Sequence, residues 1–260
     1  MNVFVTCKFC PDLDRMKQSD FVVQEEMGVD THFLPNILNC YDESSLELSL
    51  RFGETVKNLE KTAFTIGPKT SEQVLDSLLA LGFEHAVRVA TEYDVRFRPE
   101  TIAATICNYL HDHPQDLLVL GREAPLGNNA ATAQLVASYL NLPLISAVVD
   151  FSYRDESSIS VTFQHEGSLY RQEVSLPCVF SMGNATISKL RMPTLRQRMK
   201  AKNCTIEYAQ LEQKDSSLFP LPIAMRIPNR RRLSSISQKK GKDAVYELFE
   251  KDLKKRLEEV

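Results

Sequence analysis

The most constraining feature of this sequence lies in its middle, where two buried-strand patterns flank a loop and a helix. The apolar run Asp116–Leu120 predicts the first strand, and Leu144–Val149 predicts the second. Between them, Gly121–Pro143 joins a loop with two glycines to an amphipathic helical pattern. Strand, loop, helix and strand in this order predict a βαβ unit of a parallel sheet.

The loop after the first of these strands is the candidate ligand site. In open parallel sheets, ligands bind at the carboxyl ends of the strands. A loop that leads into a helix N-terminus offers backbone N–H groups and a positive dipole end to a phosphate. We therefore expect residues 121–132 to hold the phosphate or ribose of an adenine nucleotide. An ordinary connection without a ligand is the alternative, because the loop matches neither GxGxxG nor the P-loop pattern.

Strands and helices also alternate through the rest of the first half of the chain. Further strands are predicted at Asn2–Thr6, Lys61–Ile66 and Ala86–Ala90, and further helices after Asn39, after Thr70 and at Pro99–Leu110. Asp42 is the predicted N-cap of the helix after Asn39. Residues 8–37 are predicted to be irregular, apart from a small edge strand at Phe21–Val23. The alternation predicts an α/β fold, with a mostly parallel sheet and helices on both faces.

After Asp150 the pattern changes to antiparallel structure and then to a polar tail. A hairpin is predicted at residues 159–174, a buried strand at Cys178–Met182, a short basic helix before Lys202 and a last strand at Ile206–Leu211. Residues 212–260 form a C-terminal extension, whose end at Asp243–Val260 has the apolar stripe of a helix that docks. We therefore predict an α/β domain at 1–211 and an arm at 212–260.

Composition excludes several classes of function. The net charge of −3 gives no general attraction to nucleic acid, and the basic run Arg230–Arg232 has no interleaved aromatic residues. No apolar run reaches the roughly 18 residues that a membrane helix needs, so we expect no membrane insertion. The start of the chain lacks the pattern of a signal peptide, which favours a cytoplasmic protein.

Cysteine and histidine spacing gives no metal or redox site. The six cysteines are scattered along the chain, as in reduced cytosolic proteins. Cys7-x-x-Cys10 has no second ligand pair, and His111-x-His113 is read as a solvated helix end. No nucleophile, general base or paired-carboxylate arrangement is recognisable, so catalytic residues and metal ligands are both predicted to be absent.

Five short motifs, in one order, resemble the beta subunits of electron transfer flavoproteins. They cover some two hundred residues of this chain, and the last of them is the most specific. They are Lys8 with Pro11-Asp12, Asn39-Cys40-Tyr41-Asp42-Glu43, Gly67-Pro68, Gly121-Arg122-Glu123-Ala124, and Arg191-Met-Pro-Thr-Leu195 followed by Met199-Lys-Ala-Lys202.

This resemblance implies a fold of the adenine nucleotide alpha hydrolase-like type and a beta subunit that pairs with an alpha subunit. The pair would carry electrons from a flavin-dependent dehydrogenase to a downstream acceptor. FAD would be held mainly by the alpha subunit, and the redox chemistry would belong to the flavin. The C-terminal helix would be the arm that contacts the alpha subunit. Two alternatives stay open, namely a stand-alone adenine-nucleotide-binding protein of this fold and a structural partner with an empty pocket.

The resemblance also implies individual site residues. Leu195 and Lys200 would bind the partner dehydrogenase. The beta pocket would hold AMP or a second FAD, although Leu126 and Ala131 stand where the family carries hydrogen-bonding side chains. The implied pocket residues are Thr6, Asn39, Cys40, Tyr41, Asp42, Ile66, Gly121, Arg122, Glu123, Ala124, Gly127, Asn128, Asn129, Ala130, Ala131 and Thr132.

Overall fold

The structure is a computed structural model, which describes residues 1–260 except 24–27, 92–94, 126, 213–237 and 255–260, and except the side chain at 252. It divides into two compact units, Met1–Met225 and Arg226–Val260. The predicted boundary between residues 211 and 212 stays a prediction, because the adjoining residues 213–237 lie outside the described part. The proposed basic linker, including Arg230–Arg232, lies outside it too.

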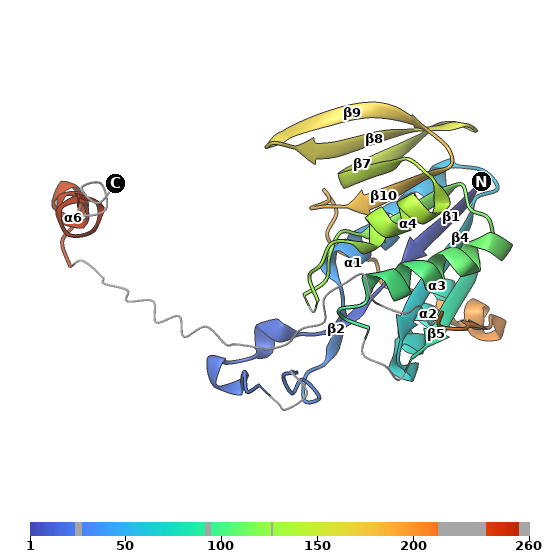
Figure 1. Cartoon of the computed structure of the whole chain (residues 1–260), viewed down its shortest axis with the longest axis horizontal. Helices are drawn as coiled ribbons and strands as arrows, with labels where there is room; N and C mark the ends of the chain where they lie inside the picture. Colours follow the sequence, from blue (N-terminus) through green and yellow to red (C-terminus); the bar gives the residue numbers. More distant parts are fainter. Residues whose placement is uncertain (24–27, 92–94, 126, 213–237, 255–260) are drawn as a thin grey trace. The chain divides into compact units, whose positions relative to one another are not determined.

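The first unit is built on one sheet (Figure 1). Its strands are β1 (Asn2–Thr6), β4 (Glu60–Gly67), β5 (His85–Ala90), β6 (Leu117–Gly121), β7 (Leu144–Asp155), β8 (Ser158–His165), β9 (Ser168–Ser175), β10 (Cys178–Met182) and β11 (Glu207–Ala209). Its helices are α1 (Cys40–Thr55), α2 (Glu72–Leu81), α3 (Pro99–Asp112), α4 (Thr132–Leu140) and α5 (Leu195–Lys200). Single 3-10 turns lie at Leu13–Arg15, Gln18–Asp20, Lys69–Ser71 and Ala201–Asn203.

The order of strands is β11-β5-β4-β1-β6-β10-β7-β8-β9. All neighbours from β11 to β7 run parallel, and β7, β8 and β9 run antiparallel. The predicted α/β class, the parallel sheet and the hairpin extension are therefore confirmed. One feature was not predicted, since β10 lies between β6 and β7, which are the two strands of the central βαβ unit.

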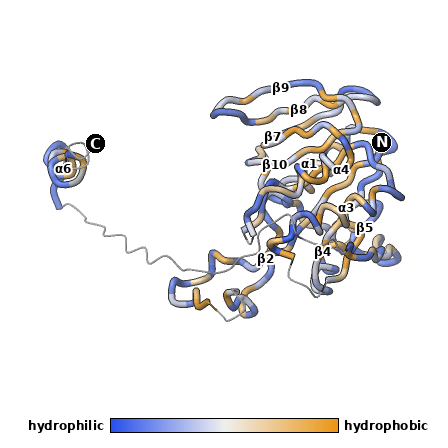
Figure 2. The backbone as a smooth tube through the Cα atoms, viewed as in Figure 1, coloured by the Kyte–Doolittle hydropathy of each residue, from blue (hydrophilic) through white to orange (hydrophobic). Residues whose placement is uncertain are grey.

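Each face of the sheet carries its own hydrophobic core. Successive residues of a strand point to opposite faces, so Val3 and Val5 of β1 join one core while Phe4 joins the other. Helices α1 and α2 pack on the first face and α3 and α4 on the second. Figure 2 shows hydrophobic residues concentrated in these strands and helices. Helices thus cover both faces, as the sequence predicts.

The region between β1 and α1 was partly mispredicted. Phe9–Pro11 forms β2, which pairs antiparallel with β3 (Asn36–Leu38), although the sequence pattern indicated a loop there. The expected strand at Phe21–Val23 is wrong, because Val23 makes only an isolated bridge with Val29. A three-residue ladder containing a proline carries no alternating pattern, so nothing in the sequence marks it as a strand.

The second unit is described over residues 238–254. It consists of α6 (Lys242–Leu248) and a π-helical turn (Phe249–Leu253). Figure 2 shows hydrophobic and hydrophilic residues side by side on α6, as expected for an amphipathic helix. Among the described residues, no helix is both long and apolar enough to cross a membrane.

Candidate functional site

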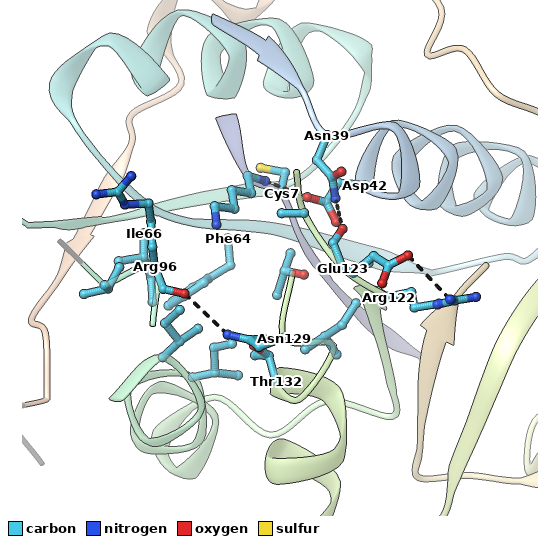
Figure 3. Close-up of a pocket in the computed structure, with 18 of the residues that line it drawn as sticks. Cys7, Asn39, Asp42, Phe64, Ile66, Arg96, Arg122, Glu123, Asn129 and Thr132 are labelled. Atoms are coloured by element: carbon cyan, nitrogen blue, oxygen red, sulfur yellow. Dashed lines mark hydrogen bonds and ion pairs between the residues drawn. The ribbon is translucent and has the colours of Figure 1, made fainter. Parts of the chain in front are cut away.

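A pocket opens at the carboxyl ends of β1, β4 and β6, where the first strand of the central βαβ unit ends (Figure 3). It encloses about 800 Å³ of space, including the part open to solvent. The pocket is bordered by the start of α1, the loop after β6, the start of α4 and the segment before α3.

Most of the residues that the sequence nominated for nucleotide binding come together in this pocket. They are Thr6, Asn39, Asp42, Ile66, Gly121, Arg122, Glu123, Ala124, Asn128, Asn129 and Thr132. Five nominated residues do not line it, namely Cys40, Tyr41, Gly127, Ala130 and Ala131. Leu126 lies outside the described residues. The nucleotide contacts themselves stay predictions.

Other pocket residues were missed by sequence reasoning. They are Cys7, Lys8, Phe64, Val95, Arg96, Ile102, Ile106 and Leu120. Four of them, Phe64, Ile102, Ile106 and Leu120, are apolar and belong to strand or helix patterns whose obvious role is core packing. Of these residues, Lys8 could have been predicted from the sequence. It lies just after the first strand, and polar residues at that edge of a parallel sheet face a ligand crevice.

Asp42 has a structural role that differs from the predicted one. Asn39, not Asp42, is the N-cap residue of α1, and Asp42 lies buried in the helix's first turn. One carboxylate oxygen of Asp42 accepts a hydrogen bond from the backbone N–H of Lys8 at 2.8 Å. Burial raises the pKa of Asp42 to about 7, although hydrogen bonds from Asn39, Lys8 and Gly121 oppose the rise. Asp42 thus joins α1 to the ends of β1 and β6.

The first turn of α1 also holds the loop that follows β6. The side-chain amide of Asn39 donates to the carbonyl of Glu123 at 2.9 Å, and the hydroxyl of Tyr41 donates to the Glu123 carboxylate at 3.2 Å. The Arg122 guanidinium lies 3.5 Å from the same carboxylate. Burial and the neighbouring Glu123 charge raise the pKa of Tyr41. Tyr41 is therefore a second support of the loop, although it does not line the pocket.

The loop itself has a strained backbone. Gly127, Asn128 and Ala130 all have positive φ angles, of 95°, 42° and 49°. A Cβ at Gly127 would stand 2.5 Å from the carbonyl oxygen of Arg96. Asn129 donates to that same oxygen at 3.4 Å and accepts from the backbone N–H of Ala131 at 3.3 Å. Glycine and asparagine tolerate a left-handed backbone, so the strain in this loop lies at Ala130, and such strain gathers at ligand sites.

This loop leads into α4, and Thr132 in the first turn of α4 lines the pocket. Within the described residues, no side chain caps the N-terminus of α4. Its first backbone N–H groups are therefore available to an anion, and the helix dipole adds to their attraction. The geometry suits a phosphate at this end of the pocket.

The charged residues of the pocket have both signs. Lys8, Arg96 and Arg122 supply positive charge and Glu123 supplies negative charge, whereas Asp42, because of its raised pKa, is only partly ionised near neutral pH. Figure 3 places Arg96 and Arg122 on opposite sides of the cavity. Among the described residues, no cluster of three or more histidine, cysteine, aspartate or glutamate side chains has a metal-binding arrangement. The pocket therefore combines charged and apolar residues in one lining.

The predicted partner-binding residues lie elsewhere, on the short helix α5. Leu195 is its first residue and Lys200 its last, and both side chains are exposed. Thr194 caps the helix, accepting from the N–H of Gln197 at 3.3 Å. An exposed leucine on a well-capped helix is consistent with a docking site, but the contact with a dehydrogenase stays a prediction.

Comparison with known proteins gives a consistent picture. Residues 26–214 match the family described as the electron transfer flavoprotein domain. YgcR of Escherichia coli K12, provisionally named an electron transfer flavoprotein subunit, is 27% identical over 260 residues, which is 99% of this chain and 100% of that protein. The electron transfer flavoprotein beta subunit of Methylophilus methylotrophus is 26% identical, with 83% of each chain covered. That of Dictyostelium discoideum is 27% identical, with 70% of this chain and 72% of the relative covered.

Proposed function

Because this chain belongs to the electron transfer flavoprotein family, among its beta subunits, we propose that it pairs with an alpha subunit to carry electrons. The donor is a flavin-dependent dehydrogenase and the recipient is a downstream acceptor. FAD is held mainly by the alpha subunit, and it supplies the electron-carrying chemistry when bound. The beta subunit contributes binding and shape, with no catalytic side chain of its own.

The observation that carries this proposal is the pocket at the end of β6. We propose that it binds an adenine nucleotide, either AMP or the adenylate part of a second FAD. The uncapped N-terminus of α4 supports binding of a phosphate. Asn128 offers an amide group for the ribose or phosphate, and the apolar wall at Phe64 and Ile66 suits a flat base.

The residue types of this chain fit such a ligand. Two glycines stand where a Cβ would collide, Gly121 against the side chain of Asp42 and Gly127 against the backbone carbonyl of Arg96. Ala131 lacks a side chain for hydrogen bonding, but its backbone N–H is held by Asn129. We assign the bracing of the loop to Asn39, Tyr41 and Asn129, and the direct contacts to Asn128 and to residues 130–132.

Two further surfaces complete the proposed function. We assign the exposed Leu195 and Lys200 of α5 to docking of the dehydrogenase. We assign α6 and the turn after it to contact with the alpha subunit. In support, Val245, Leu248 and Phe249 are all exposed in the described structure, which leaves the apolar stripe of this arm available to a partner.

Co-expression with the alpha subunit encoded in the same organism tests the proposal. The expected product is a one-to-one complex that is yellow, because it holds FAD, whereas the beta chain made alone is colourless. A beta chain that purifies as a monomer or homodimer, ignores the alpha subunit and binds ATP would favour the stand-alone alternative. A yellow complex that holds no adenylate beyond the FAD of its alpha subunit would favour the empty-pocket alternative.

A further inference from the structure

Arg191 fastens the segment before α5 to helix α1. Its Nε lies 3.1 Å from both carboxylate oxygens of Glu47, and its Nη2 lies 2.8 Å from one of them. Its Nη1 pairs with Glu54, about two turns further along α1. The backbone N–H of Arg191 donates to Glu47 at 3.1 Å as well. Arg191 therefore bonds to α1 through both its side chain and its backbone.

The neighbouring residue adds another bond of the same kind. The backbone N–H of Leu190 donates to the Glu43 carboxylate at 3.1 Å. Glu43, Glu47 and Glu54 thus form a row of carboxylates on α1 that holds residues 190–191. We call this set of contacts the Arg191 clamp.

Glu47 is the carboxylate of the clamp that most needs its basic partners, because its side chain is buried. The residue is only 3% exposed, and its charge needs partners there. Burial raises the pKa of Glu47, but hydrogen bonds from Arg191 and Arg51 outweigh it and leave the pKa below its usual value. Bidentate arginine–carboxylate pairs fix geometry as well as charge. Loss of Arg191 would leave this carboxylate with Arg51 as its remaining basic partner.

The residues just beyond the clamp are unusually exposed and apolar. Met192, Leu195 and Met199 are 79%, 75% and 70% exposed. They lie within eight residues of Arg191, on the segment that the proposed function assigns to docking. An apolar surface binds well when it is already held in its bound shape, because less conformational entropy is lost on association.

We propose that Arg191 is a positioning residue for partner docking, which fixes the presentation of Met192, Leu195 and Met199 through its ion pairs with α1. This inference rests on the proposed docking role of α5. The same helix supports the pocket, because its first turn holds the loop after β6 through Asn39 and Tyr41. One helix therefore sets the positions of both the nucleotide loop and the docking segment.

Two variants and one matched control test this inference in the complex with the alpha subunit. Arg191→Ala removes the clamp, and Arg191→Lys keeps the charge but loses the planar fork. Arg51→Ala is the control, because it removes a guanidinium from the same Glu47 carboxylate without touching the docking segment. Hydrogen exchange of the amides of residues 190 and 191 reports on the clamp. Electron transfer from the flavin-dependent dehydrogenase that reduces the wild-type complex reports on docking.

In Arg191→Ala, exchange at these two amides is expected to rise about tenfold or more. The KM for the dehydrogenase is expected to rise about tenfold, with kcat changed less than about twofold, because docking is weakened and electron transfer is not. The exchange rate and the KM of Arg191→Lys are expected to lie between those of wild type and Arg191→Ala, and those of Arg51→Ala are expected to match wild type. Reduction of the flavin by dithionite, which needs no docking, is expected to be unchanged in all of them.

Two results would overturn the inference. The first is an unchanged KM in Arg191→Ala, whether or not kcat falls. The second is a KM in Arg51→Ala that rises as much as in Arg191→Ala. A wild-type complex that no dehydrogenase reduces would instead contradict the proposed function, so the two failures are distinguishable.

Discussion

The Oδ1 atom of Asp42 lies 2.0 Å from the point where a Cβ on Gly121 would stand. A carbon and an oxygen cannot approach so closely, so only glycine fits at the end of β6. Asp42 cannot easily move aside, because it is buried and already accepts the N–H of Lys8. The close approach of Asp42 to Gly121 therefore sets the distance between α1 and the pocket loop, and with it the shape of the pocket.

Gly121→Ala is therefore expected to destabilise the fold by about 1–3 kcal/mol, the usual range for overpacking. Denaturant unfolding measures the change. Gly53→Ala is the matched control, because Gly53 lies in α1, where a Cβ would meet only the flexible end of Lys61 at 3.2 Å. Alanine in a helix interior is favoured over glycine by up to about 1 kcal/mol. Equal losses in both variants would contradict the close packing of Asp42 on Gly121.

Asp42→Asn is expected to change how stability depends on pH. The pKa of Asp42 rises from 3.8 to about 7 on folding, so the folded state holds its proton more tightly than the unfolded state does. The stabilising contribution is complete below pH 3.8 and is lost as pH rises through about 7. The asparagine variant cannot titrate at this position. Its free energy of unfolding should therefore rise relative to that of wild type as pH increases from 3.8 to about 7, by up to about 4 kcal/mol.

Urea unfolding of both proteins at several pH values checks this prediction. The informative quantity is the difference in unfolding free energy between wild type and variant, because other titrating groups cancel in it. A difference that stays constant from pH 4 to pH 8 would show that the folded state does not raise the pKa of Asp42.

Asn129→Ala is expected to weaken AMP binding about tenfold or more, because the variant loses two hydrogen bonds that brace the pocket loop, each of which contributes about 0.5–1.5 kcal/mol. Asn129 links the pocket loop to the carbonyl of Arg96 and to the N–H of Ala131. Calorimetric titration of the nucleotide-depleted complex with AMP measures the effect. Gln134→Ala, an exposed change on the helix α4 that follows the loop, serves as the control. If the two variants bind AMP alike, Asn129 does not organise the site.

Leu248→Glu is expected to weaken assembly with the alpha subunit and leave the unfolding of the first unit unchanged. Leu248 is exposed on the apolar side of α6, so a charge there disturbs only a surface that a partner covers. Sedimentation of the mixed subunits gives the dissociation constant. Lys251→Gln, a polar change on the following turn, is the control. Undiminished assembly of Leu248→Glu would assign the arm to another role.

Much of the fold could be predicted because its signals are local. Strands such as Leu117–Gly121 are continuous apolar runs, and helices such as Pro99–Asp112 have a regular apolar side and a favourable first residue. The position of β10 between β6 and β7 could not be predicted, because strand order depends on contacts between residues far apart in sequence. The ladder of β2 and β3 was too short to leave a pattern.

The site was predictable only where a loop carried the signal. Gly121, Asn128 and Asn129 stand out in a loop at a strand end, and the structure brings them to one pocket. Asp42 was misread as a helix cap, because its sequence context cannot show that Asn39 caps the helix and that Asp42 faces Gly121. Arg191 was recognised as part of a motif, but its buried partner Glu47 lies 144 residues away.

The central claim is that the pocket at the end of β6 holds an adenine nucleotide in a flavoprotein complex. The most direct test is mass spectrometry of the small molecules released when the co-purified complex of both subunits is denatured. We predict FAD together with an adenylate attributable to this chain, either AMP at one per complex or a second FAD, and a reduced amount of it in Asn129→Ala. A pure complex that releases only one FAD, with no further adenylate, would contradict the claim.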